Sequence, residues 1–300
     1  MDSTLAGTIL TRDLVAVDGR VIASQGEAVD LNYLRDVATR APRELRLRAL
    51  HETSIADAVL EAFEAPALQH LIGAQARAHV ADAVSGLRFP QEVWDELEQL
   101  RSEDPARFQH AIWTALVAAR LFRTALGDAP GLGRVLGGAL VHDLGMRHAA
   151  PRMRQKRDHL THSEALALED HPLLGALLLA SVLGDSPAVH LALLHHLRAG
   201  HGYPRVAPKT PLRGLDLISV ASAFAAMVAT RSYRPQPYSP RGAVDQLLEE
   251  SRAGHFDPRA VTLLVFCMRG AKGRLQELRL PAAATGFRPA VNHHGLANAG

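Results

Sequence analysis

Three long apolar runs are the feature that most restricts how this chain can fold. They are rich in alanine and leucine, and loops of glycine, proline and basic residues separate them: HPLLGALLLASVLG, SPAVHLALLHHL and LDLISVASAFAAMVATR. Aromatic residues make up only 5% of the chain, so such runs favour packed helices over sheets. With 47% hydrophobic residues over 300 positions, we predict one large, mainly α domain and a smaller module.

The N-terminal part follows a different pattern. Apolar residues alternate in GTILTRDLVAVDGRVIAS on both sides of Asp18-Gly19, a dipeptide typical of a hairpin turn. A short helix from Asp30 to Thr39 and a strand-like RELRLRAL are predicted to follow. We therefore predict a small β-rich module over residues 1–50.

Helix start signals define a second region. Ser54 with Asp57 resembles a capping box, while Pro66 and Pro90 each stand where a helix can begin. These signals predict a helical linker region over residues 51–103.

The main domain is predicted to span residues 104–270. Its first long helix should start at Asp104-Pro105 and end near Gly127, and two amphipathic helices should start near Ser239 and Asp257. Weak periodicity then predicts an irregular or partly disordered tail over residues 271–300.

Charge and cysteine content restrict the compartment and the partners. The formal net charge is only +2, which creates no field that would demand a nucleic-acid polymer. The single cysteine, Cys267, suits a reducing cytosol. MDSTLAG lacks the basic region of a secretion signal, and the longest uncharged apolar stretch, Leu217–Thr230, is too short to cross a bilayer. We expect a cytoplasmic protein without membrane insertion.

Histidine is unevenly distributed along the chain. Ten of the sixteen histidines fall between positions 110 and 201. Four features there lie on or at the ends of predicted helices, so that a bundle could bring them together: His110, His142-Asp143, His171 and His195-His196. Imidazole and carboxylate ligands suit iron, manganese or other divalent metals better than a cysteine-based zinc site. Taken alone, each histidine is more often a core or surface residue, and the cluster also fits a polar interface.

These ordered motifs resemble the HD-GYP branch of the HD phosphohydrolases. The resemblance covers roughly Asp104 to Met268, and it is carried by HDLG, KRDHLTHSEALALEDHP, the double histidine, HGYP, RSYRPQPYSP and HFDP. Along LTHSEALALEDHP the spacing matches the family pattern without a gap. The N-terminal module also looks like the small β-rich segment that precedes some HD-GYP domains. The resemblance implies an HD-type helical bundle that follows this module in the sequence.

The resemblance also implies an activity and a set of site residues. Members of the family hydrolyse the bacterial second messenger cyclic di-GMP, and they use a centre of two or three metal ions, often iron or manganese. By position, one metal would take Asp143, His171, His195 and His196. The other would take His110, His142, Asp143 and a downstream aspartate, so Asp143 would bridge the two. The remaining implied roles are catalytic for Asp143 and Lys156, and substrate-binding for Lys156, Gly202, Tyr203, Pro204 and Arg231.

The chain departs from the family pattern at several positions. Ser222 stands where the family has the downstream aspartate, and Met146 replaces the lysine after HDLG. Leu197 replaces an acid after the double histidine, and the loop before Gly202 is one residue shorter. Three further family carboxylates fall at Ala106, Ala199 and Ala225. Loss of a carboxylate removes negative charge that would balance a metal ion, and loss of the lysine removes a cation that would stabilise negative charge in the transition state.

Two functions therefore fit the sequence. The first is a metal-dependent phosphodiesterase of bacterial cyclic di-GMP signalling with impaired catalysis, acting on a cyclic dinucleotide or a related nucleotide. The alternative is a catalytically degenerate HD-GYP domain that senses a nucleotide or contacts a signalling protein. The sequence leaves the oligomeric state open.

The other basic side chains allow two interpretations. The arginines around Lys156 form either a phosphate clamp or a solvated loop: Arg147, Arg152, Arg154 and Arg157. Arg231 and Arg234 either contact phosphate or cap the preceding helix. We expect His190 to be structural, His201 to lie at the surface or supply an extra ligand, and the remaining histidines of the basic loop to be exposed: His148, His159 and His162.

Overall fold

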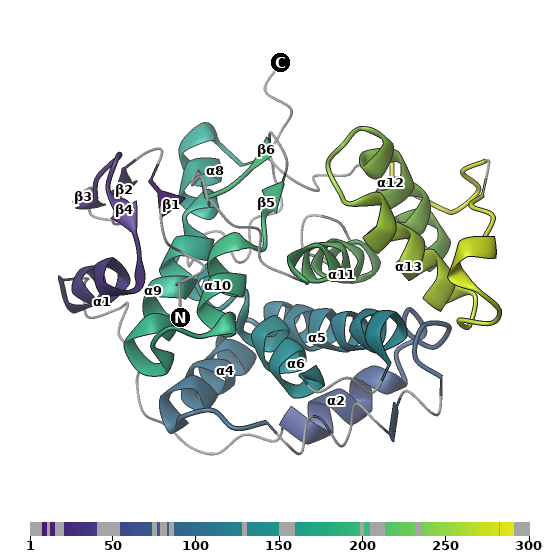
Figure 1. The fold of residues 1–300 in the computed structure, drawn as a ribbon, viewed down its shortest axis with the longest axis horizontal. Coiled ribbons are helices and arrows are strands. Elements are labelled where there is room, and N and C mark those ends of the chain that lie inside the picture. The colour runs from purple at the N-terminus through teal and green to yellow at the C-terminus, as the bar shows by residue number, and fades with distance from the viewer. Residues whose placement is uncertain are drawn as a thin grey trace.

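A computed structural model of the chain is mainly α-helical, which confirms the predicted fold class (Figure 1). The described residues are 8–10, 13–15, 21–40, 55–73, 77–78, 83, 87–127, 131–149, 160–198, 201–204, 214–231, 234, 236–281 and 283–290. The predicted Asp18-Gly19 turn, the strand-like RELRLRAL and Lys156 lie outside the described residues.

A central bundle contains the three apolar runs. Its helices are α5 (Pro105–Leu126), α6 (Leu132–Val141), α9 (His171–Leu183), α10 (Pro187–Leu194) and α11 (Leu215–Val228). Helix α5 packs against α6 and α11, while α10 packs against α6 and α9 (Figure 1). Most of α9 and α10 is buried on every side, as expected for core helices that are apolar all round.

The predicted helix boundaries of the main domain are confirmed. Asp104 caps α5, since its side chain accepts a hydrogen bond from the backbone N–H of Arg107, and Gly127 ends the helix with a positive φ of 67°. Ser239 and Asp257 cap α12 (Pro240–Arg252) and α13 (Pro258–Met268) in the same way.

Helices before residue 104 cover the bundle. Helix α2 (Ile55–Phe63) packs on α5, and α4 (Gln91–Glu103) packs on α5 and α9. Pro90 precedes α4 as predicted. The helix predicted to start at Pro66 is wrong, because residues 66–71 form successive turns instead. Leu68, Leu71 and Ile72 are buried all the same, so the segment packs into the core without forming a helix.

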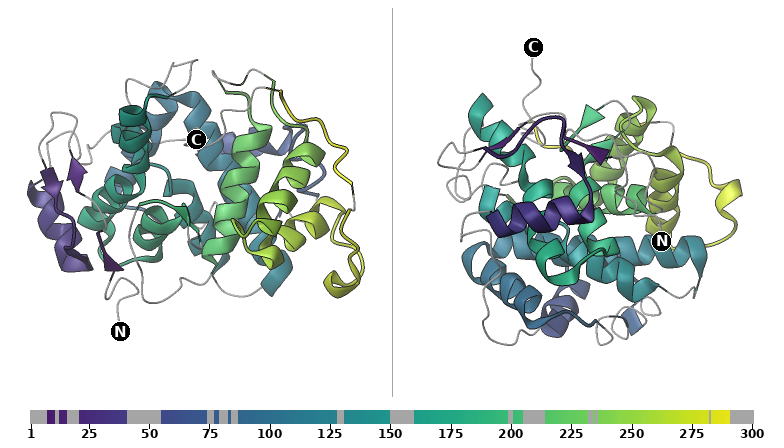
Figure 2. Two further views of the ribbon diagram at one scale, coloured as in Figure 1. Left: turned by 90° about the horizontal axis from the view of Figure 1, so that it is seen from above. Right: turned by 60° about the vertical axis from the view of Figure 1, so that its left-hand side comes forward.

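The N-terminal module lies at one end of the molecule, and α12 and α13 lie at the other (Figure 2). Strand β1 (Thr8–Ile9) pairs antiparallel with β4 (Ala28–Val29), and β2 (Leu14–Val15) pairs antiparallel with β3 (Val21–Ala23). Helix α1 (Leu31–Arg40) follows as predicted and packs against α9. The module is therefore joined directly to the bundle.

The described part of the C-terminal tail is irregular apart from the short 3-10 helix η3 (Leu275–Glu277). Its end is nevertheless fixed to α12. The buried Asp245 carboxylate accepts hydrogen bonds from the backbone N–H groups of Thr285 and Gly286, both at 2.9 Å, and Arg288 pairs with Glu249 at 2.7 Å. Weak periodicity predicts the irregularity but not this attachment.

Within the part of the chain that the structure describes, one stretch, His162–Leu183, is long and apolar enough to cross a membrane. It comprises α8 (His162–Glu169) and α9, and 61% of its most apolar window is buried inside the fold. Because α9 packs against α10 and α1, the stretch has the surroundings of a core helix.

Candidate metal centre

Three histidines of the candidate site occupy the ends of helices. His142 follows α6, His195 follows α10, and His171 begins α9 directly after α8. Each ring donates its Nδ1–H to the backbone carbonyl three residues earlier: Ala139 at 2.6 Å, Ala192 at 2.9 Å and Leu168 at 2.7 Å. The last carbonyls of a helix lack partners within the helix, so these rings both cap the helix ends and fix their own orientation.

Gly145 of HDLG allows the His142-Asp143 turn to lie against α9. A Cβ at position 145 would lie 2.0 Å from the carbonyl oxygen of His171 and 2.4 Å from the backbone nitrogen of Gly175. No side chain fits there, because the contacts are with backbone atoms. The glycine thus brings Asp143 next to His171.

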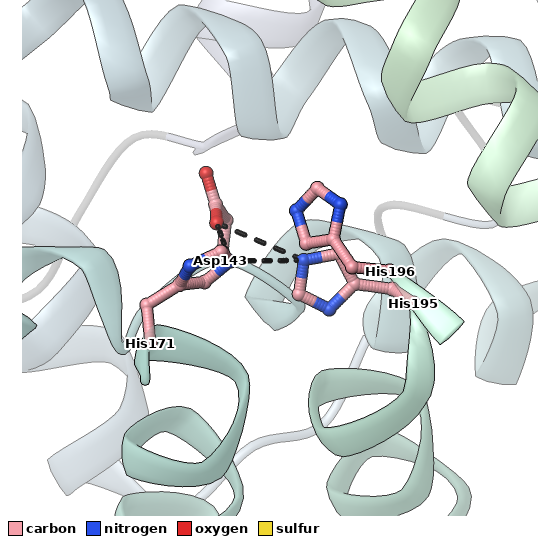
Figure 3. Close-up of side chains that lie close together, drawn as sticks. All are labelled: Asp143, His171, His195 and His196. Atoms are coloured by element: carbon pink, nitrogen blue, oxygen red, sulfur yellow. Dashed lines mark hydrogen bonds and ion pairs between the residues drawn. The ribbon is translucent and has the colours of Figure 1, made fainter. Parts of the chain in front are cut away.

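The first ligand group contains Asp143, His171, His195 and His196, each offering one atom within 4.8 Å of the others (Figure 3). The Nε2 atom of His171 lies 3.0 Å from Oδ1 of Asp143 and 3.1 Å from Nε2 of His195. The four side chains come from three separate segments and face one point, as the sequence predicts. Their role as ligands remains a proposal.

The second group contains His110, His142 and Asp143, also within 4.8 Å of one another. His110 lies on α5, and its Nε2 atom is 3.9 Å from Oδ2 of Asp143. The buried Ser222 hydroxyl on α11 lies 3.4 Å from the same nitrogen. Position 222 therefore borders this group, as the resemblance to HD-GYP proteins implies, but it offers no carboxylate.

The chemistry of these atoms fits a cation. The Nδ1–H groups of His171 and His195 are used by carbonyls, so both Nε2 atoms are hydrogen-bond acceptors when each ring carries a single N–H. They nevertheless face each other at 3.1 Å, with the Asp143 carboxylate beside them. A proton on one ring or a metal ion must lie among them to avoid repulsion. Within the described residues, buried Nε2 of His142 also has no hydrogen-bond partner.

The pKa shifts of the buried groups favour the protonation states that bind a divalent metal. Burial lowers the pKa of the His195 and His196 imidazoles well below the ordinary value, and charge on neighbouring imidazoles acts in the same direction. Burial alone would raise the pKa of Asp143, but its charge and hydrogen-bond interactions with His171 help to hold it well below the usual range. An ionised carboxylate and neutral imidazoles are the forms that bind metal. The C-terminal ends of α6, α8 and α10 also favour a cation, while the N-terminal end of α9 opposes it.

A family model described as "HD domain" matches residues 100–260. The chain belongs to the HD-domain family. A curated relative, the 3'3'-cGAMP-specific phosphodiesterase 1 of Vibrio cholerae, is 30% identical over 131 residues. The alignment covers 42% of this chain and 30% of the relative, so less than a third of the relative's length is matched. Together the two matches confirm an HD domain that resembles the HD-GYP branch.

The HGYP motif of the HD domain lies against the histidines. The Tyr203 ring stacks on the His196 ring with a centroid distance of 4.4 Å, and burial raises the pKa of its hydroxyl. Gly202 has a φ of 106°, and a Cβ there would lie 2.2 Å from the carbonyl oxygen of His196. Pro204 is buried. Gly202 therefore serves the loop conformation, while the Tyr203 side chain contacts the cluster through His196.

Arg231 and Arg234 have different surroundings in the structure. Arg234 caps α11, donating hydrogen bonds to the carbonyls of Met227 at 3.0 Å and Ala229 at 3.2 Å. Charge on Arg231 helps to lower the pKa of His110, behind the larger effect of burial, so Arg231 lies near the second group.

Two expectations for the loop after HDLG are wrong for the described residues. Arg147 does not belong to an open clamp or a solvated loop, because it pairs with Glu96 at 2.6 Å and with Glu103 at 3.0 Å. His148 is not exposed, since its side chain retains only 8% of its accessible surface and lies 3.4 Å from Glu96. Burial of Glu96 on α4 creates a demand for positive partners. His162 is exposed as predicted, and His190 pairs with Asp185 at 2.6 Å.

Sequence reasoning missed two neighbours of the double histidine. Ser219 on α11 donates a hydrogen bond to the carbonyl of His195 at 2.8 Å. Arg198 stacks over the Phe256 ring at 4.0 Å, and its charge contributes to lowering the pKa of His196. Their signals are weak: Ser219 lies three positions before Ser222, and Arg198 two positions after His196.

The buried histidines make the stability of the metal-free HD domain depend on pH. Their pKa values in the folded state lie below the unfolded value of about 6.5, so the unfolded chain binds more protons in acid. The free energy of unfolding should therefore fall as the pH drops below about 6.5, by up to about 1.4 kcal/mol per pH unit for each such histidine.

Urea unfolding in the presence of a chelator, at about pH 7.5 and about pH 5.5, measures this dependence. His195→Asn should reduce the difference between the two conditions, whereas replacement of the exposed His162 by glutamine should leave it unchanged. Equal stability of the unsubstituted protein at both values would contradict the burial of neutral imidazoles.

Proposed function

We propose that this HD domain is a metal-dependent phosphodiesterase with impaired catalysis that acts on a cyclic dinucleotide in bacterial, cytoplasmic signalling. The observation that carries the proposal is the first ligand group, in which the acceptor atoms of Asp143, His171 and His195 face one another. A buried arrangement of this kind is unfavourable unless a proton or a metal ion lies between the acceptors, and a divalent metal can bind all of them at once.

Asp143, His171, His195 and His196 would hold one divalent ion, with iron or manganese as the best match to imidazole and carboxylate ligands. His110 and His142 would contribute to a second, weaker position that shares Asp143. A bound divalent ion would supply Lewis-acid stabilisation of phosphoryl oxygens. Among the chain's own groups, Asp143 orients the ligand set, while the substrate contacts are proposed to come from Lys156, Gly202, Tyr203, Pro204 and Arg231.

Impaired catalysis is proposed from two neutral positions. Ser222 borders the second group without a carboxylate, so that position lacks charge to balance a metal ion. Met146 is buried in the hydrophobic core and provides no cation for a developing negative charge. Losses of this kind each cost about 10²–10³ in rate in well-studied sites.

The relative's name supports a cyclic dinucleotide as the substrate class. Cyclic di-GMP, proposed from the motifs, and 3'3'-cGAMP share two phosphodiester bonds and a guanine base, so both are tested. Incubation of the protein with each nucleotide and Mn²⁺ or Fe²⁺ should yield a slowly accumulating linear dinucleotide, detected by chromatography. Removal of metal with a chelator should stop the reaction, and added Mn²⁺ should restore it. Absence of product with both nucleotides and both metals would reject the enzymatic proposal.

The second candidate function is a sensing or protein-interaction domain without turnover. The neutral Ser222 and the core position of Met146 favour it. Calorimetry would then detect binding of the intact cyclic dinucleotide, or of a signalling protein, while the nucleotide remains unhydrolysed.

A further inference from the structure

The side chain of Arg147 joins the segment after HDLG to α4. Its Nη1 atom lies 2.6 Å from Oε2 of Glu96, and its Nη2 and Nε atoms lie 3.0 and 3.1 Å from the Glu103 carboxylate oxygens. Nη2 also donates to the side-chain oxygen of Gln99. Three residues of one helix thus surround a single guanidinium, which can form several hydrogen bonds in a fixed geometry.

The three acceptors lie on one face of α4. Positions 96, 99 and 103 follow the three- and four-residue spacing that places side chains above one another on a helix. Glu96 is fully buried, and only 11% of the Arg147 side-chain surface is accessible. This is a buried ion pair, and removal of Arg147 would leave the Glu96 carboxylate with the more distant His148, at 3.4 Å, beside it. It is therefore more than an exposed surface contact.

The turn before Arg147 carries Asp143, which both ligand groups share. The backbone N–H of Arg147 donates to the carbonyl of Leu144 at 3.2 Å, and that of Met146 donates to the carbonyl of Asp143 at 3.0 Å. On its other side the turn is packed against α9 through Gly145. Arg147 follows Asp143 by only four positions, so a guanidinium fixed to α4 restrains the short turn that carries the carboxylate.

We propose that α4 supports the metal centre through Arg147. Glu96, Gln99 and Glu103 hold the Arg147 side chain in place. Arg147 in turn acts as a positioning residue that keeps Asp143 facing the histidines. The metal-binding aspect rests on the proposed function. Helix α4 begins at Gln91, before the matched HD region at residue 100, so the family match alone does not indicate this role.

Replacement of Arg147 by methionine tests the proposal in the full chain. Mn²⁺ affinity, measured by calorimetry on the folded fraction, should weaken about tenfold, the lower end for loss of a residue that orients metal ligands. Amide hydrogen exchange of residues 144–148 in the metal-free protein should become faster. Arg147→Lys should recover part of both properties because it keeps the charge, and Glu103→Gln provides a milder version of the same loss.

Arg101→Met is the matched control, since Arg101 lies on the same helix and pairs with Glu98 at 2.5 Å in an exposed position. It should change neither Mn²⁺ affinity nor the exchange of residues 144–148. If Arg147→Met and Glu103→Gln behave like this control in both measurements, the proposal is overturned. If the unsubstituted protein binds no Mn²⁺, the proposed function fails, and amide exchange alone decides whether Arg147 holds the turn.

Discussion

Replacement of Asp143 by asparagine is expected to abolish tight metal binding by the whole protein. Asp143 is the one residue common to both ligand groups, and its carboxylate is the anionic member of each. Asparagine has nearly the same shape but no charge, so the imidazoles would remain without a partner that balances a divalent ion. Metal affinity should fall more than about 100-fold, since even residues that only orient ligands contribute about 10–100-fold.

The exposed histidine His162 supplies the control for that experiment. It lies at the start of α8, outside both ligand groups, so His162→Gln should keep the metal affinity of the unsubstituted protein. Calorimetric titration with Mn²⁺ compares the two variants. Equal affinity in Asp143→Asn and His162→Gln would show that the metal, if any, binds elsewhere.

Replacement of Ser222 by aspartate is expected to create a second tight metal position. The Ser222 hydroxyl lies 3.4 Å from Nε2 of His110, so a carboxylate there would complete the group of His110, His142 and Asp143. Affinity for a second Mn²⁺ should increase at least about tenfold, and hydrolysis of the cyclic dinucleotide should increase with it. Without metal, the variant should be less stable because its new carboxylate is buried.

Ser222→Asn separates charge from shape in this experiment. It has the size of aspartate but lacks the anionic oxygen, so it should not gain the second ion. If Ser222→Asp binds a second metal without faster hydrolysis, substrate positioning is also impaired, which favours the sensing function. If it folds but gains no metal, position 222 does not correspond to the family aspartate.

Local signals were sufficient to predict most of the fold. Apolar runs and capping residues such as Asp104 and Ser239 located the helices, because helix ends are determined by nearby side chains. The prediction of a helix at Pro66 was wrong because a proline marks a possible helix start but does not show whether the residues after it continue as a helix. The tail's attachment through Asp245 depends on contacts between distant segments, which periodicity cannot indicate.

In the candidate site, too, local motifs predict some features, while others depend on contacts between distant segments. Motif order was sufficient to predict which histidines meet around Asp143. The partners of Arg147 could not be predicted, because Glu96 lies fifty-one positions earlier in the sequence and only the packing of α4 brings it close. Nor does a run of basic residues reveal which members face a buried acid. The stacking of Tyr203 on His196 likewise depends on the conformation of the loop.

Metal content is the most direct test of a metal centre in this HD domain. The unsubstituted protein should be produced in medium containing iron and manganese, purified without a metal-chelating column, and analysed by elemental mass spectrometry beside Asp143→Asn. The first ligand group predicts about one tightly bound divalent ion per chain in the unsubstituted protein and almost none in the variant. Absence of bound metal from the unsubstituted protein, even after addition of Mn²⁺ or Fe²⁺, would contradict the metal centre.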